Sequence, residues 1–184
     1  MENVPSILQI GILSHELASK LKPASFADPN VQQRRSWKLV DGKKPLHSFV
    51  NLYIYARNPA MYALVHRDDC VDELCVLRVS LKVLEKPGIY ITDGNAADAE
   101  TTFTKGLKGF ENIDWEILLA PSWLPRDEGY EERKRIKCAE VLVPHRVEPE
   151  YIFGAWVASW RVKYKLEAMT PALPVDINSA LFFQ

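Results

Sequence analysis

The sequence contains few cysteines, and the three present, Cys70, Cys75 and Cys138, form no CxxC pair. An odd number without close pairs argues against a disulfide framework, and structural zinc sites usually take two such pairs. Cys70 and Cys75 lie near three aspartates between residues 68 and 72, so a metal site there is the alternative interpretation. We expect reduced thiols and no metal, as is usual in a cytoplasmic protein.

Long hydrophobic runs are also missing, because the apolar stretches are far shorter than the roughly 18 residues that cross a membrane. Glu2 follows Met1 directly, and residues 1–17 lack the basic start of a secretory signal. The net charge is only −1, so any anionic partner must be bound by a local basic patch. These features predict a cytoplasmic protein without a membrane segment.

Short motifs that identify many enzymes are absent as well: the sequence has no Walker loop, GxGxxG, HExxH or GxSxG. What is present is the composition of an ordinary globular protein, with 47% hydrophobic and 26% charged residues. A length of 184 residues suits one domain and leaves little room for two. We therefore expect residues 1–184 to form a single domain.

Hydrophobic periodicity predicts helices and strands that alternate irregularly. Helical spacing runs from Asn3, a possible cap, to about residue 20, and Gly11 interrupts it. A long loop with one short helix around residues 31–37 follows. Further helices are expected at 58–64, 98–106, 113–119 and 131–137, and strands at 49–55, 74–84, 89–91, 141–143, 152–159 and through Val162. Adjacent strands favour an α+β fold over a doubly wound parallel sheet.

The segment from residue 34 to residue 44 is basic, with five positive side chains against one negative, and it contains Trp37. A basic loop that carries an aromatic ring suits a phosphate backbone or a pyrophosphate. The alternative is the solvated face of a mobile loop.

Glu140 stands at the start of a short apolar strand, directly after the basic run at residues 133–137. Burial raises the pKa of such a carboxylate and neighbouring cations lower it. This makes Glu140 a candidate for a catalytic group with a tuned pKa. The alternative is an edge-strand glutamate paired with Lys137 or Arg135.

Two other segments have both a functional and a structural interpretation. Residues 92–97 (TDGNAA) could shape a substrate pocket, or could form a turn that caps the next helix. In residues 53–59 the aromatic rings could stack on a ligand ring, but a strand that passes into a helix explains the same residues.

Taken together, the segments NVPSILQIGILS, VQQRR, LHSFVNLYIYARNPAMY, TDGNAA and AEVLV resemble the DarT family of DNA ADP-ribosyltransferase toxins. The resemblance covers nearly the whole chain. It implies an ADP-ribosyltransferase-like fold, in which a small split β-sheet is surrounded by helices and encloses an NAD cleft. It also implies NAD-dependent ADP-ribosylation of a base in single-stranded DNA, by the toxin of a toxin–antitoxin pair. A macrodomain antitoxin removes the mark, and some members act in phage defence.

The resemblance also assigns residues by position. Arg35 and Glu140 match the catalytic arginine and glutamate. Ser6, Ser14, Arg35 and Tyr53 match positions that contact NAD, under a loop at about residues 19–37. The segment from about 92 to 140 would bind the substrate, and the candidates for DNA contact are Trp37, Thr92, Asp93, Asn95 and Trp123.

These assignments imply a mechanism. Glu140 would hold a ribose hydroxyl and stabilise the positive charge that develops as the nicotinamide leaves. Arg35 keeps its charge, so it suits phosphate binding and polarisation of the acceptor base better than proton abstraction. The acceptor would be single-stranded because pairing hides its Watson–Crick edge, and Trp37 and Trp123 could stack on bases. For Trp123 the alternative is a loop anchor packed on the core.

The sequence departs from the family pattern in two places. Family members open with a strand that bears a His-x-Thr motif, which holds the nicotinamide end of NAD, directly before the segment with which this chain begins. We therefore expect a shortened chain or an incomplete NAD site. Asn95 stands where some members carry histidine, so the base preference could differ. The alternatives are an ADP-ribosyltransferase acting on RNA or protein, and an inactive relative that binds nucleic acid.

Overall fold

The computed structural model describes residues 1–21, 23–25, 28–66 and 70–184, which contain seven α-helices and eleven strands. The helices are α1 (Val4–Ile10), α2 (His15–Ala18), α3 (Pro29–Ser36), α4 (Pro59–Val65), α5 (Trp115–Leu119), α6 (Tyr130–Ile136) and α7 (Trp160–Met169). The strands are β1 (Ile12–Leu13), β2 (Leu39–Val40), β3 (Lys44–Pro45), β4 (Phe49–Tyr53), β5 (Val76–Val79), β6 (Tyr90–Thr92), β7 (Phe103–Lys105), β8 (Glu140–Pro144), β9 (Arg146–Val147), β10 (Ile152–Val157) and β11 (Val175–Ile177).

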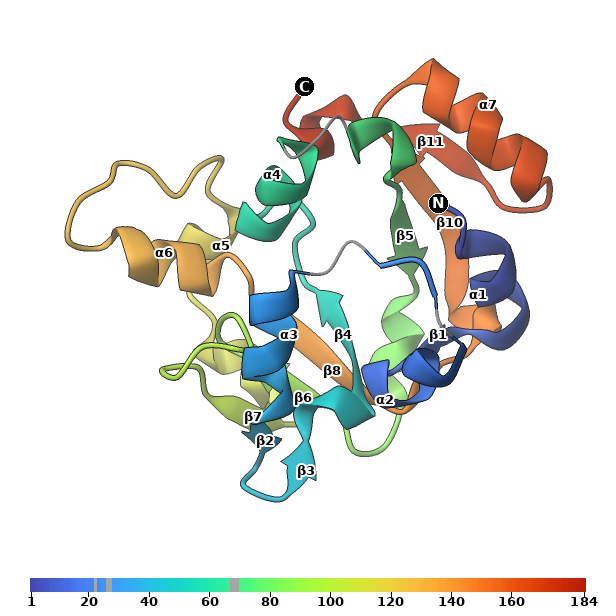
Figure 1. The fold of residues 1–184 in the computed structure, drawn as a ribbon. Coiled ribbons are helices and arrows are strands. Elements are labelled where there is room, and N and C mark those ends of the chain that lie inside the picture. The colour runs from blue at the N-terminus through green and yellow to red at the C-terminus, as the bar shows by residue number, and fades with distance from the viewer. Residues whose placement is uncertain (22, 26–27, 67–69) are drawn as a thin grey trace.

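Two main sheets form the centre of the molecule (Figure 1). The first has four antiparallel strands in the order β4-β8-β6-β7. The second has the order β11-β10-β5, in which β10 is parallel to β11 and antiparallel to β5. β4 and β5 are edge strands, and residues of both line one cleft. This arrangement confirms the predicted α+β fold with a small split sheet.

Alternation along the strands gives the first sheet two different faces. Val50 of β4 and Val141 and Val143 of β8 belong to a hydrophobic cluster that also contains Leu118 of α5 and Ile136 of α6. Helices α5 and α6 therefore cover this face. The intervening positions of β4 and β8 point to the other face, toward α3, where the polar residues of the candidate site lie.

The N-terminal segment turns at Gly11, between α1 and β1. Gly11 has a φ of +88°, and a Cβ at this position would lie 2.3 Å from the carbonyl oxygen of Val147. The predicted break in the helical pattern is confirmed. Asn3 precedes α1, but its side chain donates to the carbonyl of Ala24 at 2.7 Å and makes no cap hydrogen bond. Asn3 is thus the N-cap residue of α1, as predicted, and it caps the helix through its backbone carbonyl, which accepts from the Ile7 amide at 2.9 Å.

Two predicted elements differ from the structure. One differs because its residues pair with a strand, and the other because a polar side chain starts a 3₁₀ helix. Residues 98–106 were expected to be helical, but Phe103–Lys105 form β7 because they pair with β6. The strand expected over residues 74–84 ends at Val79. Ser80 accepts a hydrogen bond from the amide of Lys82 and starts a 3₁₀ helix, Leu81–Glu85.

A third difference lies near the C-terminus, where Val162 was expected in a strand and instead lies in α7. The hydroxyl oxygen of Ser159 accepts from the Val162 amide at 3.4 Å and caps this helix. Strand β11, which follows α7, was not predicted. The cap at Asn58, by contrast, is confirmed, because its side chain accepts from the Met61 amide at 2.9 Å.

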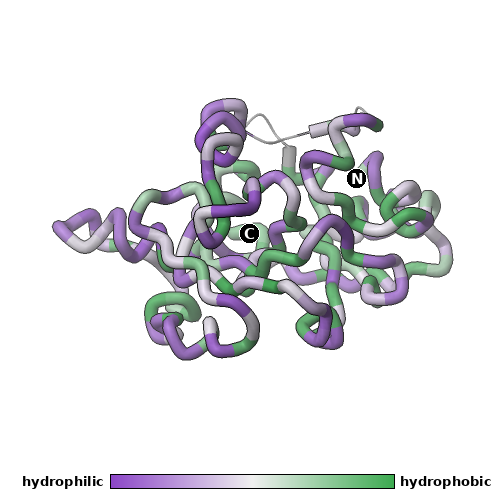
Figure 2. The backbone as a smooth tube through the Cα atoms, turned by 90° about the horizontal axis from the view of Figure 1, so that it is seen from below, coloured by the Kyte–Doolittle hydropathy of each residue, from purple (hydrophilic) through white to green (hydrophobic). Residues whose placement is uncertain are grey.

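Hydrophobic and hydrophilic residues alternate over short stretches throughout the chain (Figure 2). Within the part of the chain that the structure describes, no helix is both long and apolar enough to span a membrane.

Candidate active site

Glu140 is the first residue of β8, and its backbone is fixed from two sides. It lies opposite Tyr53 in the antiparallel register with β4. Its amide donates to the hydroxyl of Thr92 at 2.9 Å, and this hydroxyl donates in turn to the carbonyl of Gly94 at 2.6 Å. The side chain of Glu140 is 1% exposed. The strand pairing and Thr92 together hold the carboxylate in a fixed, buried position.

The Glu140 carboxylate accepts four hydrogen bonds. Arg35 donates from Nη2 to Oε1 at 2.7 Å and from Nη1 to Oε2 at 3.3 Å. The Asn51 side chain donates to Oε2 at 2.7 Å, and the backbone amide of Ala96 donates to Oε1 at 3.0 Å. Two ionised oxygens offer about four acceptor positions, so the carboxylate is saturated. A ligand hydroxyl would have to displace one of these donors, and the longest contact is the one from Arg35 Nη1.

Arg35 reaches Glu140 from the last turn of α3. Asp28 caps this helix, because its carboxylate accepts from the amides of Asn30 and Val31. The first helical residue is Pro29. Arg35 is buried, at 8% exposure. Burial alone would lower the pKa of Arg35, but the Glu140 charge and hydrogen bond outweigh burial and raise this pKa above its ordinary value. Arg35 therefore keeps its positive charge beside Glu140.

The alternative partners of Glu140, Lys137 and Arg135, bind elsewhere. Lys137 is buried and donates from Nζ to the carbonyls of Leu118 and Ala120 at the end of α5. Arg135 binds Glu132 and Asp93. The interpretation of Glu140 as an edge-strand residue paired with the neighbouring basic run is therefore wrong, and its cation comes from residue 35.

Arg35 and Glu140 lie at a cleft of about 1640 Å³ between the two sheets. Its lining includes Gln32 of α3, Asn51 and Tyr53 of β4, and Arg78 of β5. The cleft is open to solvent and has a buried carboxylate in its lining, which makes it the candidate active site.

The four residues predicted to contact NAD differ in position. Arg35 and Tyr53 line the cleft, and Tyr53 is partly exposed there. Ser6 lies exposed on α1. Ser14 is fully buried and caps α2, where its hydroxyl oxygen accepts from the Leu17 amide. Contacts of Ser6 and Ser14 with NAD remain predictions.

The predicted DNA-contacting residues separate into exposed and buried ones. Trp37 follows α3 and is 82% exposed, so its ring is available to a base. Asn95 and Asp93 lie on the loop after β6, with Asp93 bound to Arg135. Thr92 is fully buried and holds the backbone of Glu140, and its contact with DNA stays a prediction.

Trp123 is 8% exposed and belongs to an aromatic cluster. Its ring meets those of Tyr62 and Phe183 edge to face, with centroids 5.5 and 6.0 Å apart. Its indole N–H donates to the Tyr130 hydroxyl at 3.3 Å. This placement favours a loop anchor over a ring that stacks on DNA.

The described residues contain no group of three or more His, Cys, Asp or Glu side chains that could hold a metal ion. Asp68 and Asp69 of the possible metal cluster lie outside the described residues. Cys138 is buried two positions before Glu140, and burial followed by the Glu140 charge raises the pKa of its thiol to about 12. A thiol of this kind is protonated and is not a nucleophile at neutral pH.

Two of the donors to the Glu140 carboxylate were not predicted from the sequence. Asn51 was read only as part of a strand, and the amide of Ala96 belongs to a loop 44 residues away from Glu140 in sequence. The position of Asn51 in the strand pattern, on the same face as Tyr53, is the signal that could have identified it.

Residues 1–183 match the family model described as ssDNA thymidine ADP-ribosyltransferase, DarT. A relative from Thermosipho africanus, a DNA ADP-ribosyl transferase–DNA ADP-ribosyl glycohydrolase fusion protein, is 33% identical over the whole of this chain. The chain corresponds to 47% of that protein, so it spans about half the length of the fusion.

Solved structures are similar over nearly the whole chain. That of Thermosipho africanus DarTG in complex with ADP-ribose has a TM-score of 0.85 at 30% identity, covering 99% of this chain and 49% of that one. Thermus sp. 2.9 DarT in complex with ADP-ribosylated ssDNA has a TM-score of 0.82 at 22% identity, covering 98% and 91%. The same Thermus protein in complex with NAD+ has a TM-score of 0.76 at 20% identity, covering 98% and 92%.

The Thermus structures establish likeness of fold alone, because their identity to this chain is low. The match of the family model to residues 1–183 extends over almost every residue of the sequence, including Arg35 and Glu140. The chain therefore belongs to the DarT family.

Proposed function

We propose that this chain is one catalytic domain that transfers ADP-ribose from NAD to a base of single-stranded DNA, with Arg35 and Glu140 as its catalytic residues. The observation that carries the proposal is the buried Arg35–Glu140 pair, 2.7 Å between Nη2 and Oε1, at the side of a cleft of about 1640 Å³. The family description names thymidine as the acceptor nucleoside. A thymine base is accordingly the first acceptor to test.

Glu140 would act on the ribose of NAD. In the transfer the bond between the anomeric carbon and the nicotinamide nitrogen breaks, and nicotinamide leaves with the electron pair. A nitrogen of the base bonds to the same carbon and loses one proton. Glu140, a fixed carboxylate in a buried site, would stabilise the positive charge that develops on the ribose and would accept that proton.

Arg35 would control the availability of Glu140. In the structure it occupies both carboxylate oxygens, and the longer of its two contacts, 3.3 Å from Nη1 to Oε2, is the weakest donor on the carboxylate. A ribose hydroxyl that replaces this contact would leave Nη1 free to bind a phosphate or to polarise the acceptor base. A guanidinium keeps its proton under these conditions, so it serves as an electrostatic group and not as the base.

The acceptor would be a single-stranded nucleic acid because base pairing hides the atoms that react. Trp37 is well placed for a stacking contact, since it is exposed and follows directly on the helix that carries Arg35. Lys43 and Lys44 in the following turn are exposed as well and could bind phosphates.

The biological role follows from the relatives. The Thermosipho africanus protein joins a DNA ADP-ribosyl transferase to a DNA ADP-ribosyl glycohydrolase, so we infer that this chain is the toxin of a toxin–antitoxin pair. Its partner would be a macrodomain glycohydrolase that reverses the modification. It would act in the cytoplasm, where its substrates are present, and could serve in phage defence.

The test is incubation of the protein with labelled NAD and with separate acceptors: single-stranded DNA with and without thymine, double-stranded DNA, RNA and protein. We expect label on thymine-containing single strands, and its loss in Glu140→Gln, which keeps the shape of the side chain but removes its charge. Label confined to RNA or protein would select another acceptor class. Binding of oligonucleotides without any transfer would identify an inactive relative.

A further inference from the structure

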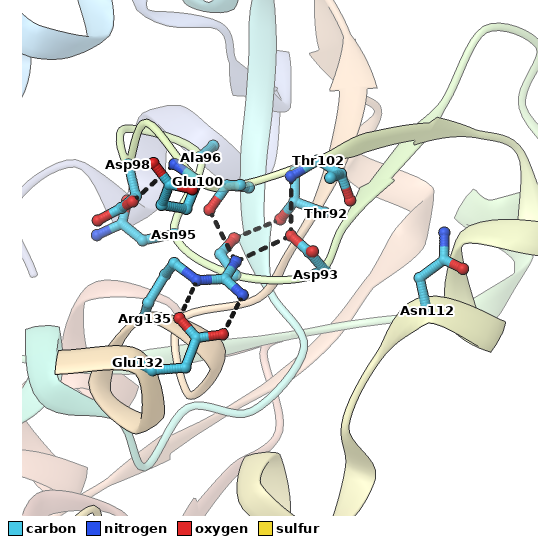
Figure 3. A network of polar contacts seen from close by, with 12 residues as sticks. Thr92, Asp93, Asn95, Ala96, Asp98, Glu100, Thr102, Asn112, Glu132 and Arg135 are labelled. Carbon is cyan, nitrogen blue, oxygen red and sulfur yellow. Dashed lines mark hydrogen bonds and ion pairs between the residues drawn. The ribbon is translucent and has the colours of Figure 1, made fainter. Parts of the chain in front are cut away.

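Arg135, in the last turn of α6, binds two carboxylates and a hydroxyl group. Its Nε and Nη2 donate to the two carboxylate oxygens of Glu132, each at 2.7 Å. Its Nη1 donates to Oδ1 of Asp93 at 3.0 Å and to the hydroxyl of Thr101 at 3.2 Å. Only 10% of the side chain is exposed. Four of the five donors of this guanidinium are therefore used, and Figure 3 shows it between Glu132 and Asp93.

Asp93 closes the loop that follows β6. The oxygen that accepts from Arg135 also accepts from the amide of Thr102, at 2.9 Å. Asp93 stands at the start of this loop and Thr102 at its end, directly before β7. Oδ1 of Asp93 thus joins the two ends of the loop at residues 93–102. Arg135 binds the same oxygen and so holds the loop against α6 (Figure 3).

The same loop is held to α6 once more through the backbone, and a neighbouring amide of the loop binds the Glu140 carboxylate. The amide of Asn95 donates to the carbonyl of Arg135 at 3.0 Å. The next residue, Ala96, is fully buried and donates from its amide to Oε1 of Glu140 at 3.0 Å. Adjacent residues of the loop therefore make the contact with the Arg135 carbonyl and the contact with Glu140.

Gly94 provides the space for the Arg135 side chain. A Cβ at residue 94 would lie 2.4 Å from Nη1 of Arg135 and 2.9 Å from its Cγ. Any larger residue would move the guanidinium away from Asp93. A loop glycine, a partly buried arginine and two carboxylates are thus arranged to keep one loop conformation.

We propose that Arg135 is a positioning residue for the transferase centre: it fixes the loop at residues 93–102 so that the Ala96 amide stays bound to the Glu140 carboxylate. This inference rests on the proposed function for its effect on catalysis. The placement of Ala96 by Arg135, however, is a property of the folded protein and is measured without any substrate.

The test uses Arg135→Gln, which removes the charge, and Arg135→Lys, which keeps a cation that can reach Asp93. Lys134→Gln is the matched control, because Lys134 belongs to the same helix, is 44% exposed and lies 3.6 Å from the carboxylate of Glu131. Hydrogen exchange is followed at the Ala96 amide and, as an internal reference, at the Val141 amide in β8. Transfer from NAD to a thymine-containing single strand is measured in parallel.

We expect Arg135→Gln to lower the protection of Ala96 relative to Val141 by about tenfold, the order of effect of losing a hydrogen bond to a charged group. The kcat should fall by about tenfold while the KM for NAD changes by less than about twofold. Arg135→Lys should recover part of both effects, and Lys134→Gln should behave as the unchanged protein. The comparison with Val141 separates loss of the loop contact from general unfolding.

Unchanged protection of Ala96 in Arg135→Gln would overturn the proposal, whatever the activity. Equal loss of protection at Ala96 and Val141 would overturn it too, because Arg135 would then stabilise the whole fold. If the unchanged protein transfers nothing to any acceptor, the proposed function fails, and the exchange measurement still decides whether Arg135 positions the loop.

Discussion

At the scale of single residues, the candidate site consists of one carboxylate with four donors from three separate segments. Arg35 comes from α3, Asn51 from β4 and the Ala96 amide from the loop after β6. A buried carboxylate without partners would cost several kcal/mol. These donors therefore stabilise the folded protein, and they also keep Glu140 ready for a substrate that takes the place of one of them.

Arg35→Gln should destabilise the protein, because it leaves a buried carboxylate without its counter-ion. Removal of one partner from a buried ion pair costs about 3–5 kcal/mol, and the remaining donors from Asn51 and Ala96 should hold the loss to about 2–3 kcal/mol. Urea denaturation measures this difference. Arg34→Gln is the matched control, since Arg34 is exposed on the same helix. Equal stability of the two variants would show that the buried pair contributes nothing.

Protonation of His47 should make the stability of the folded protein depend on pH near neutrality. Its pKa lies below the ordinary value of 6.5, first because of burial and then because of the charges of His15 and Arg35. The rings of His47 and His15 lie 4.1 Å apart, and Nε2 of His47 is buried and has no hydrogen-bond partner among the residues that the structure describes. The unfolded chain therefore takes up this proton more readily than the folded protein.

The contribution of His47 to stability is complete above pH 6.5 and is lost as the pH falls toward its lowered pKa. Urea denaturation between about pH 7 and pH 5 should show falling stability, with a smaller slope in His47→Gln. Identical slopes for the two proteins would mean that another group carries the dependence.

Several residues of this site could be predicted from the sequence and others could not. Glu140 and Arg35 were identified because they lie in segments that resemble a family. Asn51 and the Ala96 amide were not, since they reach Glu140 across 89 and 44 residues of sequence. Such contacts depend on the register of β4 and β8 and on one loop conformation, and a local pattern specifies neither.

At the scale of elements, the turn between α1 and β1 depends on a residue without a side chain. Gly11→Ala should destabilise the protein strongly, because it combines a φ of +88° with a Cβ 2.3 Å from the carbonyl oxygen of Val147. Gly42 is the matched control, since its φ is +65° but nothing lies within 4 Å of its Cβ position. The control should lose about 1–2 kcal/mol from backbone strain alone.

Gly11→Ala should therefore lose clearly more than Gly42→Ala, because β1 must move away from β9 to relieve the contact. The difference in the free energy of unfolding between the two variants is the quantity to measure. Equal losses would show that the chain at Gly11 adapts without cost, and that its close approach to β9 is not needed.

Elements were predicted well where a local signal determines them and poorly where a partner does. The break at Gly11 and the cap at Asn58 are local, and both are confirmed. Residues 103–105 form a strand only because β6 offers an edge to pair with. Val162 lies in a helix because Ser159 caps it, and a lone serine after an apolar strand is a weak signal for a helix start.

At the scale of the whole molecule, the two sheets place a basic helix, a buried carboxylate and a large cleft together, although the net charge is only −1. The overall charge gives no indication of an anionic substrate, and the cations that matter are those near the cleft. Arg35 is buried within the site, and exposed basic residues follow α3 in the turn at Lys43 and Lys44. Binding of nucleic acid should accordingly be local and sensitive to salt.

Intact mass analysis of a short oligonucleotide tests whether Glu140 carries out the proposed transfer of ADP-ribose to single-stranded DNA. After incubation with NAD and the unchanged protein, we predict that a thymine-containing strand gains the mass of one ADP-ribose group. With Glu140→Gln, folded to the same extent, the gain should fall by at least about a thousandfold. A variant that modifies the strand as fast as the unchanged protein would contradict the account.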